Sequence, residues 1–505
     1  MQDQFSKIRA FFWPIHGYEL KKFLPMGMMM FCALFNYTIV RNAKDALVVK
    51  AAGAETISFI KFWVIMPLAI LFVILYTKAS NKLTKEKLFH YTILPFIIFF
   101  ACFGFILYPA RDFLLPDQST VDAMIAAAPA LRWFIMIYAK WLYVLFYAFA
   151  ELWGSVIITL LFWQFANQIT RVFEAKRYYA MFGLIGNFGL ILAGVTSTWL
   201  SNYGQRVVGA NGNPFDVTIQ YVLGAFTIFG FLFMYLYYWT NKNVMSDPRL
   251  YDPEAVAPKK KKPKLSLGES FKLIMSSKYL LLIFTLVMSY GIAINLVEVT
   301  WKKQLGHAFS SMNDYLAFMG SFSTYTGIIT IILMLIGTNI VRIFGWLVAA
   351  IATPIMLLVT GSIFFSSVLF QDTVMGITAA LSTTPLMLAV VVGMVQNVLT
   401  KASKYSLFDP TKEMSYIPLD DDLKVKGKAA IEVVGGRLGK SGGSIIQQIL
   451  LVTIAAGAVQ GQEMIAPYLF GFVVLIIGMW IFAICKLNAR FSALSKAQAE
   501  KTESQ

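Results

Sequence analysis

The sequence predicts an all-α integral membrane protein with twelve transmembrane helices in two six-helix halves. Hydrophobic residues make up 58% of the 505 residues, and the mean hydropathy is +0.66. Both values lie above the range of soluble globular domains. Apolar windows of about 20 residues, the length that crosses a bilayer as a helix, recur along the whole chain.

Six apolar windows precede one long central break, and six follow it. We expect the first six helices near residues 24–41, 57–77, 91–108, 134–163, 178–200 and 218–240. We expect the other six near residues 279–300, 318–338, 344–366, 376–400, 429–458 and 465–486. The chain then divides into an N-terminal half (1–240), a basic cytoplasmic linker (241–278) and a C-terminal half (279–505). This is the layout of a major-facilitator-like transporter, whose substrate site lies near the bilayer midplane between the halves.

The connections between these windows alternate in positive charge. One set holds Lys78, Lys82, Lys85, Lys87, Arg171, Lys176, Arg177, Arg342, Lys401, Lys404, Lys424, Lys426 and Lys428. The other set holds Arg111, Arg132, Arg206, Lys302 and Lys303. Cytoplasmic loops carry the excess of Lys and Arg, so both termini are expected in the cytoplasm, at the inner membrane of a bacterium.

The lysine run 259–264 in the linker is interpreted as a solvated segment that follows the same charge rule. On this interpretation the net charge of +16 follows from basic cytoplasmic loops. The expected surroundings are membrane lipids, and no nucleic acid partner is expected. Binding of nucleic acid or of lipid headgroups by the run is the alternative. The start of the chain lacks a continuous apolar core and a cleavage site, so it is expected to be a cytoplasmic tail.

No metal or cofactor is expected, because the residues that bind metals are few and scattered. The three cysteines and three histidines are Cys32, Cys102, Cys485, His16, His90 and His307. None of the cysteines forms a CxxC pair, so neither a disulfide framework nor a zinc site is indicated.

Charged residues lie inside several apolar windows, where each costs roughly 2.5–3.5 kcal/mol on insertion scales. Arg41 and Lys44 are three residues apart and share a helix face, and Asp45 is placed to orient one of them. A guanidinium beside an ammonium group suits a phosphate or carboxylate, so the pair predicts an anionic substrate. The alternative is that both cations extend to the membrane interface.

Glu151 lies deep in the fourth window and needs a partner from another helix, because its own helix offers no charge within a turn. The alternative role for Glu151 is a structural ion pair that locks its helix to that partner. Lys140 precedes Glu151 by eleven residues and is expected on the same face of their helix, roughly 16 Å away along the axis. In the seventh window Glu298 and Lys302 have the spacing of a helical ion pair. A faint internal repeat aligns Asn295 and Lys303 with Asn36 and Lys44.

The glycine-rich segment 435–443 contains Arg437 and Lys440, three residues apart. It is not a Walker loop, because the position of the first required glycine is Val434. A helix that starts near Ala429 would carry Lys440 close to mid-bilayer, where we expect both cations to bind substrate together with Arg41 and Lys44. Close helix packing is the alternative role of the glycines. The polar stretch 401–414 is expected in a long cytoplasmic loop, as a surface helix or a gate.

At these residues the chain resembles the nucleotide transporter family of plastids and obligate intracellular bacteria, the ATP/ADP translocases. The matching stretches are 37–49, 150–169, 295–302 and 404–444. The resemblance implies that the family's important charged positions fall on Lys44, Glu151, Glu298 and Lys440. The chain departs from the family at Asn42-Ala43, where an acidic or hydroxyl residue is usual near the arginine.

The resemblance implies a transporter and not an enzyme, with ATP and ADP as exchanged substrates, and it leaves open whether phosphate travels with ADP. The main alternative is a proton-coupled importer of other nucleotides or organic phosphates, in which Glu151 or Glu298 carries the proton. A membrane ATPase or kinase is disfavoured by the failed Walker spacing.

Overall fold

The computed structural model describes residues 9, 13–209, 212–251, 267–456, 458 and 460–503. These described residues form helices, turns and connections, and no strand occurs among them. Eleven of the helices are long and apolar enough to cross a membrane. The predicted all-α membrane fold is therefore confirmed.

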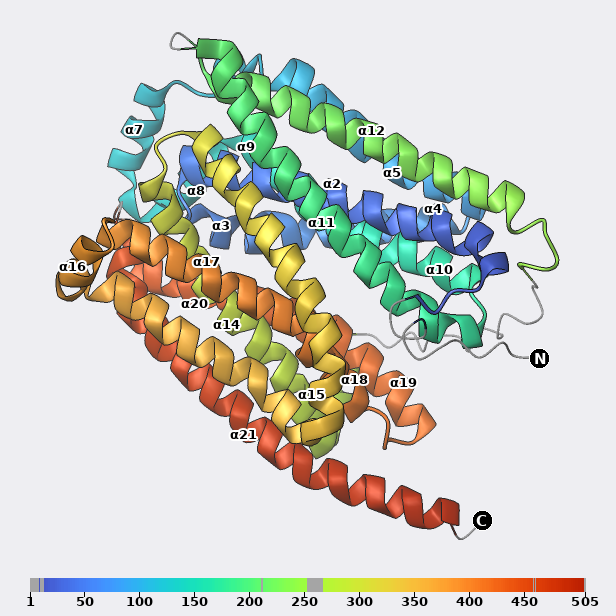
Figure 1. The fold of residues 1–505 in the computed structure, drawn as a ribbon. Coiled ribbons are helices and arrows are strands. Elements are labelled where there is room, and N and C mark those ends of the chain that lie inside the picture. The colour runs from blue at the N-terminus through green and yellow to red at the C-terminus, as the bar shows by residue number, and fades with distance from the viewer. Residues whose placement is uncertain are drawn as a thin grey trace.

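Figure 1 shows one group of helices that runs from blue to green and a second group that runs from yellow-green to red. The long helical segments of the first group are α2 (Leu20–Ala52), α3–η2–α4 (Thr56–Phe59, Ile60–Ile65, Met66–Ser80), α5–η3 (Lys85–Cys102, Phe103–Leu107), α9–η5–α10 (Trp141–Trp153, Gly154–Phe162, Trp163–Ile169), α11 (Val172–Val208) and α12 (Pro214–Asn243). Its short helices are η1 (Gly17–Glu19), α6 (Arg111–Leu114), α7 (Gln118–Ala127), η4 (Pro129–Leu131) and α8 (Arg132–Ala139).

The second group begins with the short helix α13 (Leu267–Ser276) and the long helix α14 (Lys278–Ala308). It continues with α15 (Met312–Leu369), α16 (Gln371–Ala380), α17–η7–α18 (Pro385–Ser403, Lys404–Phe408, Asp409–Ser415), α19–η8–α20 (Asp421–Ala430, Ile431–Gly435, Gly436–Thr453) and α21 (Gly461–Glu503). Two candidate membrane spans, Met312–Gly337 and Asn339–Leu369, lie within α15. Within it Gly345 has a φ of 78°, a left-handed conformation that glycine adopts without strain.

Four predicted segments differ from the structure. The window 376–400 is interrupted between α16, which ends at Ala380, and α17, which begins at Pro385, and the span starts at Pro385. The window 134–163 is interrupted at Lys140, whose φ of −114° and ψ of 33° are not helical, and the span runs from Trp141 to Ile169. The stretch 401–414 is not a loop, because α17, η7 and α18 continue through it as one span. Helical structure before the eleventh window begins at Asp421 rather than Ala429, and α20 falls outside the eleven apolar candidates.

The central linker is described only at its two ends. Helix α12 ends at Asn243 and α13 begins at Leu267, so the predicted linker includes a short helix. The lysine run 259–264 lies outside the described residues.

The two groups meet where α11 crosses the first part of α15. A Cβ atom on Gly194 would lie 2.5 Å from the carbonyl oxygen of Gly320, so the two backbones are in contact. Beside this contact the Thr198 hydroxyl donates a hydrogen bond to the Ala317 carbonyl at 3.0 Å. Small residues allow such close approach between membrane helices, where dispersion and hydrogen bonds drive association.

The glycine contact predicts a stability difference between two otherwise similar substitutions. We expect Gly194→Ala to lower the melting temperature of the purified protein by several degrees, because overpacking of this kind costs about 1–3 kcal/mol. Gly224→Ala in α12 is the control, since a Cβ there meets nothing within 4 Å. A melting temperature for Gly194→Ala at or above that of the control would contradict the backbone contact.

Candidate functional site

Seven charged side chains form one continuous ion-pair network where the two groups of helices meet. Its members are Arg41, Lys44 and Asp45 of α2, Glu151 of α9, Glu298 and Lys302 of α14, and Lys401 of α17. We call these seven residues the charge network. Four cations face three carboxylates, so one positive charge remains.

The first part of the charge network lies within the N-terminal group of helices. The Lys44 ammonium is 2.9 Å from Asp45 Oδ1 and 3.1 Å from Glu151 Oε1. It also lies 3.7 Å from the centroid of the Tyr147 ring, a cation–π contact. Lys44 therefore joins α2 to α9 through a carboxylate and an aromatic face.

The second part crosses to the C-terminal group. Lys302 Nζ is 2.9 Å from Asp45 Oδ2 and 3.4 Å from Glu298 Oε1. The same Glu298 oxygen lies 3.2 Å from Lys401 Nζ and 3.6 Å from Arg41 Nη2. One carboxylate oxygen thus serves three cations from three helices, and two ion pairs, Asp45–Lys302 and Arg41–Glu298, span the two groups.

Solvent exposure divides the charge network into two faces. The side chains of Lys44, Asp45 and Lys302 are at most 3% exposed. Those of Arg41, Glu151, Glu298 and Lys401 are 13–23% exposed. One face is therefore sealed in protein, and the other is reachable by a polar ligand.

Burial along α2 and α14 shows from which end the network is reached. On α2, residues 42–49 are buried on every side, whereas Phe31, Leu34, Tyr37 and Arg41 form a partly exposed stripe. On α14, residues 299–305 are likewise buried. The C-terminal ends of both helices therefore form a sealed end, and their N-terminal ends lead to an open end.

Polar contacts between the two groups hold the sealed end together. Lys303 Nζ lies 2.9 Å from Glu55 Oε1, and Lys50 donates to the carbonyls of Gly306 and Phe309 at 2.9 and 2.6 Å. These contacts lie beyond the charge network when it is viewed from the open end. A ligand that enters at the open end meets the exposed face of the network first.

Wide π-helical turns lie close to the exposed charges. Lys61 lies in η2, Glu151 precedes η5 by three residues, and Lys401 precedes η7 by three. Lys61 is close enough for its charge to act on Glu298, so a fifth cation supplements the four of the network. Such turns interrupt regular helical hydrogen bonding and are frequent at functional sites.

The structure brings together six of the residues predicted from the sequence. They are Arg41, Lys44, Asp45, Glu151, Glu298 and Lys302. Glu151 has the expected partner from another helix, which is Lys44, and Glu298 forms the expected helical pair with Lys302.

The predicted relation between Lys140 and Glu151 is wrong, because the helix is interrupted at Lys140 and the two do not share a continuous helix. Asn295 lies outside the network and donates to the Ser444 hydroxyl at 3.4 Å. Lys303, its neighbour in the predicted repeat, belongs to the sealed end.

The side chains of Arg437 and Lys440 lie outside what the structure describes, but their backbone positions are in α20. The neighbouring Gly439 approaches Gly291 of α14 closely, since a Cβ on Gly291 would lie 2.9 Å from it. Gly291 is about 10 Å from Glu298 along the helix axis, toward the open end. The backbone at Lys440 therefore lies on the open-end side of Glu298.

Two residues close to the exposed face were missed from the sequence. Lys401 was assigned to a loop because it follows an apolar window, although no glycine or proline breaks the helix before Pro410. Lys61 lies inside a predicted span. Because a charge within the membrane is costly, its position alone was a signal that could have identified it.

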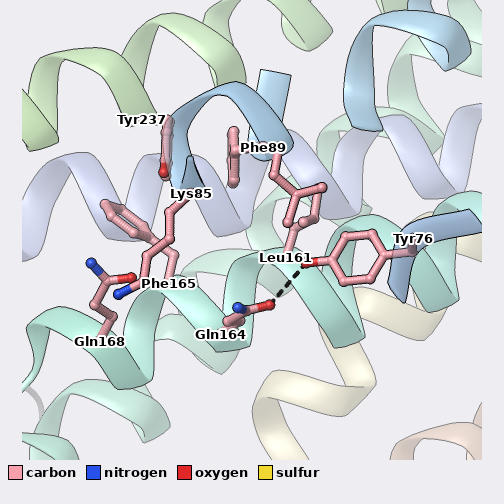
Figure 2. Close-up of a pocket in the computed structure, with 9 residues that line it drawn as sticks. Tyr76, Lys85, Phe89, Leu161, Gln164, Phe165, Gln168 and Tyr237 are labelled. Atoms are coloured by element: carbon pink, nitrogen blue, oxygen red, sulfur yellow. Dashed lines mark hydrogen bonds between the residues drawn. The ribbon is translucent and has the colours of Figure 1, made fainter. Parts of the chain in front are cut away.

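A small cavity is lined by residues of α4, α5, η5, α10 and α12 (Figure 2). No residue of the charge network lines it. Its volume is about 30 Å³, and the Tyr76 hydroxyl donates to Gln164 Oε1 beside it at 3.1 Å. Ligand pockets usually measure about 300–1,000 Å³. This cavity is too small for a nucleotide, and Lys85 is the one charged residue among those that line it.

Sequence comparisons match this chain to transporters over nearly its full length. The family model described as TLC ATP/ADP transporter matches residues 1–491. The chain is 48% identical over 504 residues to ADP,ATP carrier protein 1 of Chlamydia muridarum, covering 99% of this chain and 94% of that protein. It is 44% identical to ADP,ATP carrier protein 1 of Rickettsia prowazekii, covering 98% of each chain. The chloroplastic ADP,ATP carrier protein 1 of Arabidopsis thaliana is 46% identical, with coverage of 95% and 76%.

Solved structures of transporters share the fold at low sequence identity. A bacterial homologue of the iron transporter ferroportin, in an inward-facing state, gives a TM-score of 0.56 at 11% identity and covers 94% of this chain and 99% of that one. The xylose transporter XylE from E. coli, in an inward open conformation, gives 0.52 at 13% identity, with coverage of 92% and 95%.

The charge network predicts unequal costs for removing its carboxylates. We expect Asp45→Asn to destabilise the protein by about 3–5 kcal/mol, because it leaves Lys44 and Lys302 buried without their shared carboxylate. Glu151→Gln removes a more exposed charge and is expected to cost less. Thermal unfolding of both purified variants measures the difference. Equal melting temperatures would contradict the division into a sealed and an exposed face.

Proposed function

Because this chain belongs to the TLC ATP/ADP transporter family, we propose that it is a membrane antiporter that exchanges ATP for ADP by alternating access. One observation carries the proposal: a charge network with surplus positive charge lies between the two groups of helices, with one face sealed and one exposed. A polyanion fits such a face, since phosphates are bound by clustered Lys and Arg side chains.

Glu298 is proposed to hold the place of a substrate phosphate. Its Oε1 atom contacts Arg41 and Lys401 on the exposed face. An entering phosphate competes for the same two cations and releases them from the carboxylate. Arg41, Lys44, Glu151 and Glu298 then act as the binding group, and Arg437 and Lys440 are proposed to add cations from α20.

Alternating access follows if the two halves, 1–240 and 279–505, rock against each other as units. Opening the sealed end separates ion pairs such as Asp45–Lys302 and leaves buried charges unpaired, which is costly. A bound nucleotide compensates the cations and lowers this cost. An empty carrier then crosses slowly, which is the condition for obligatory exchange.

The orientation is proposed from the charges of the connections. Lys302 and Lys303, which were counted as loop cations, are buried in α14. This leaves Arg111, Arg132 and Arg206 on the less basic side, where the interruption of the helix also places Lys140. That side still holds far fewer cations than the other. Both termini and the open end then face the cytoplasm of a bacterium.

Counterflow in vesicles tests exchange against proton-coupled import. We expect purified protein in vesicles to take up labelled ATP only when the vesicles are preloaded with ADP or ATP, because the empty carrier crosses slowly. Vesicles preloaded with an inert anion are the control. Uptake into empty vesicles driven by a pH gradient would instead support the proton-coupled importer.

The role of Glu298 as a placeholder predicts a kinetic signature. We expect Glu298→Gln to lower the maximal exchange rate by about tenfold or more while leaving KM equal or lower, because the amide competes poorly for Arg41 and Lys401 when substrate leaves. Glu413→Gln, in an exposed ion pair with Lys428, is the matched control. A raised KM at an unchanged rate would show that Glu298 acts in some other way.

A further inference from the structure

Three tyrosines lie on the open side of the charge network, on three different helical segments. Tyr37 precedes Arg41 by four residues on α2, and Tyr405 follows Lys401 by four residues in η7. Tyr290 precedes Glu298 by eight residues on α14. At 1.5 Å per residue, these side chains begin about 6 to 12 Å from the network along the helix axes. We call Tyr37, Tyr290 and Tyr405 the tyrosine tier.

Tyr405 faces the space between the two groups of helices. Its side chain is 51% exposed and lies close to Tyr37 and Arg41, which belong to the opposite group. The ring is therefore placed beside the exposed face of the charge network. The Lys404 ammonium lies 4.5 Å from the ring centroid and is held by Asp409 at 2.7 Å.

The other two rings of the tier are held by packing. Tyr290 stacks on Phe408, with ring centroids 4.9 Å apart and an interplanar angle of 20°. Trp480 meets both of these rings edge-on. Tyr37 packs against Gly154 of η5, where a Cβ atom would lie 2.7 Å from its ring. The tier is thus a pre-arranged set of aromatic surfaces around one exposed ring.

We propose that the tyrosine tier binds the nucleoside part of the transported nucleotide, with the base stacked on Tyr405 and the phosphates on Arg41 and Lys401. This inference rests on the proposed function. The charge network supplies cations for phosphates but no aromatic surface for a base. A nucleotide that enters from the open end with its phosphates leading places its base at the level of the tier.

Stacking on a tyrosine does not distinguish one base from another, because every base has a π face. The tier therefore favours nucleotides over inorganic polyphosphates. It does not select adenine over other bases. Each nucleoside triphosphate that the protein binds is expected to depend on Tyr405 to a similar extent.

Binding of ATP and of inorganic tripolyphosphate to purified protein tests the proposal. We expect Tyr405→Leu to weaken ATP binding by about tenfold, the loss typical for one stacked base, and to leave tripolyphosphate binding unchanged. Tyr405→Phe retains the ring and is expected to bind ATP nearly as well as the unsubstituted protein. Tyr468→Leu, at a position in α21 with the same 51% exposure, is the matched control.

Equal weakening of ATP and tripolyphosphate by Tyr405→Leu would overturn the proposal, because the residue would then act on the phosphates. Unchanged ATP binding would overturn it as well. If Tyr405→Leu is poorly folded, the pair Tyr37→Leu and Tyr37→Phe makes the same comparison from the opposite half. Counterflow by the unsubstituted protein is measured separately, so failure of ATP/ADP exchange is distinguished from failure of the tier.

Discussion

Asp45 placed between two lysines at the boundary of the two halves is the interaction on which the rest of the site depends. Lys44 comes from its own helix and Lys302 from the opposite half, and all three side chains are almost completely buried. Buried charges are tolerated when they are paired, and breaking such a pair costs several kcal/mol. The contacts that close the boundary between the halves are therefore the same contacts that neutralise the buried charges. Separating the halves at this point leaves those charges unpaired.

This constraint explains why the exposed face is built differently. Glu298 shares one oxygen among Arg41, Lys302 and Lys401, so each of these contacts is longer than the buried pairs around Asp45. An anion that approaches from the open end competes with a carboxylate rather than with water. The sealed face holds the two halves rigidly together. The exposed face supplies cations that an incoming substrate frees from Glu298.

The helices around the site combine close contacts with interrupted segments. Gly194 and Gly320 bring α11 and α15 into backbone contact, which fixes where the halves cross. In contrast, η2, η5 and η7 place wide turns beside Lys61, Glu151 and Lys401. Rigid crossing points with local irregularity near the charges suit a protein whose halves move as units while the binding residues adjust.

The sequence by itself determined the membrane class and most spans. It also singled out Arg41, Lys44, Glu151 and Glu298, which the structure joins in one ion-pair network. Hydropathy indicates which segments are stable in the bilayer, and it is a property of each segment alone. A charged residue in an apolar window can likewise be identified without knowing which helices pack against it. Only the tertiary structure decided that Asp45 bridges two lysines, that Lys401 completes the network, and that one end is sealed. Ion pairs between helices and solvent access depend on how distant segments pack. A local pattern does not contain that information, which is why Lys401 was predicted in a loop and Lys140 on the same continuous helix as Glu151.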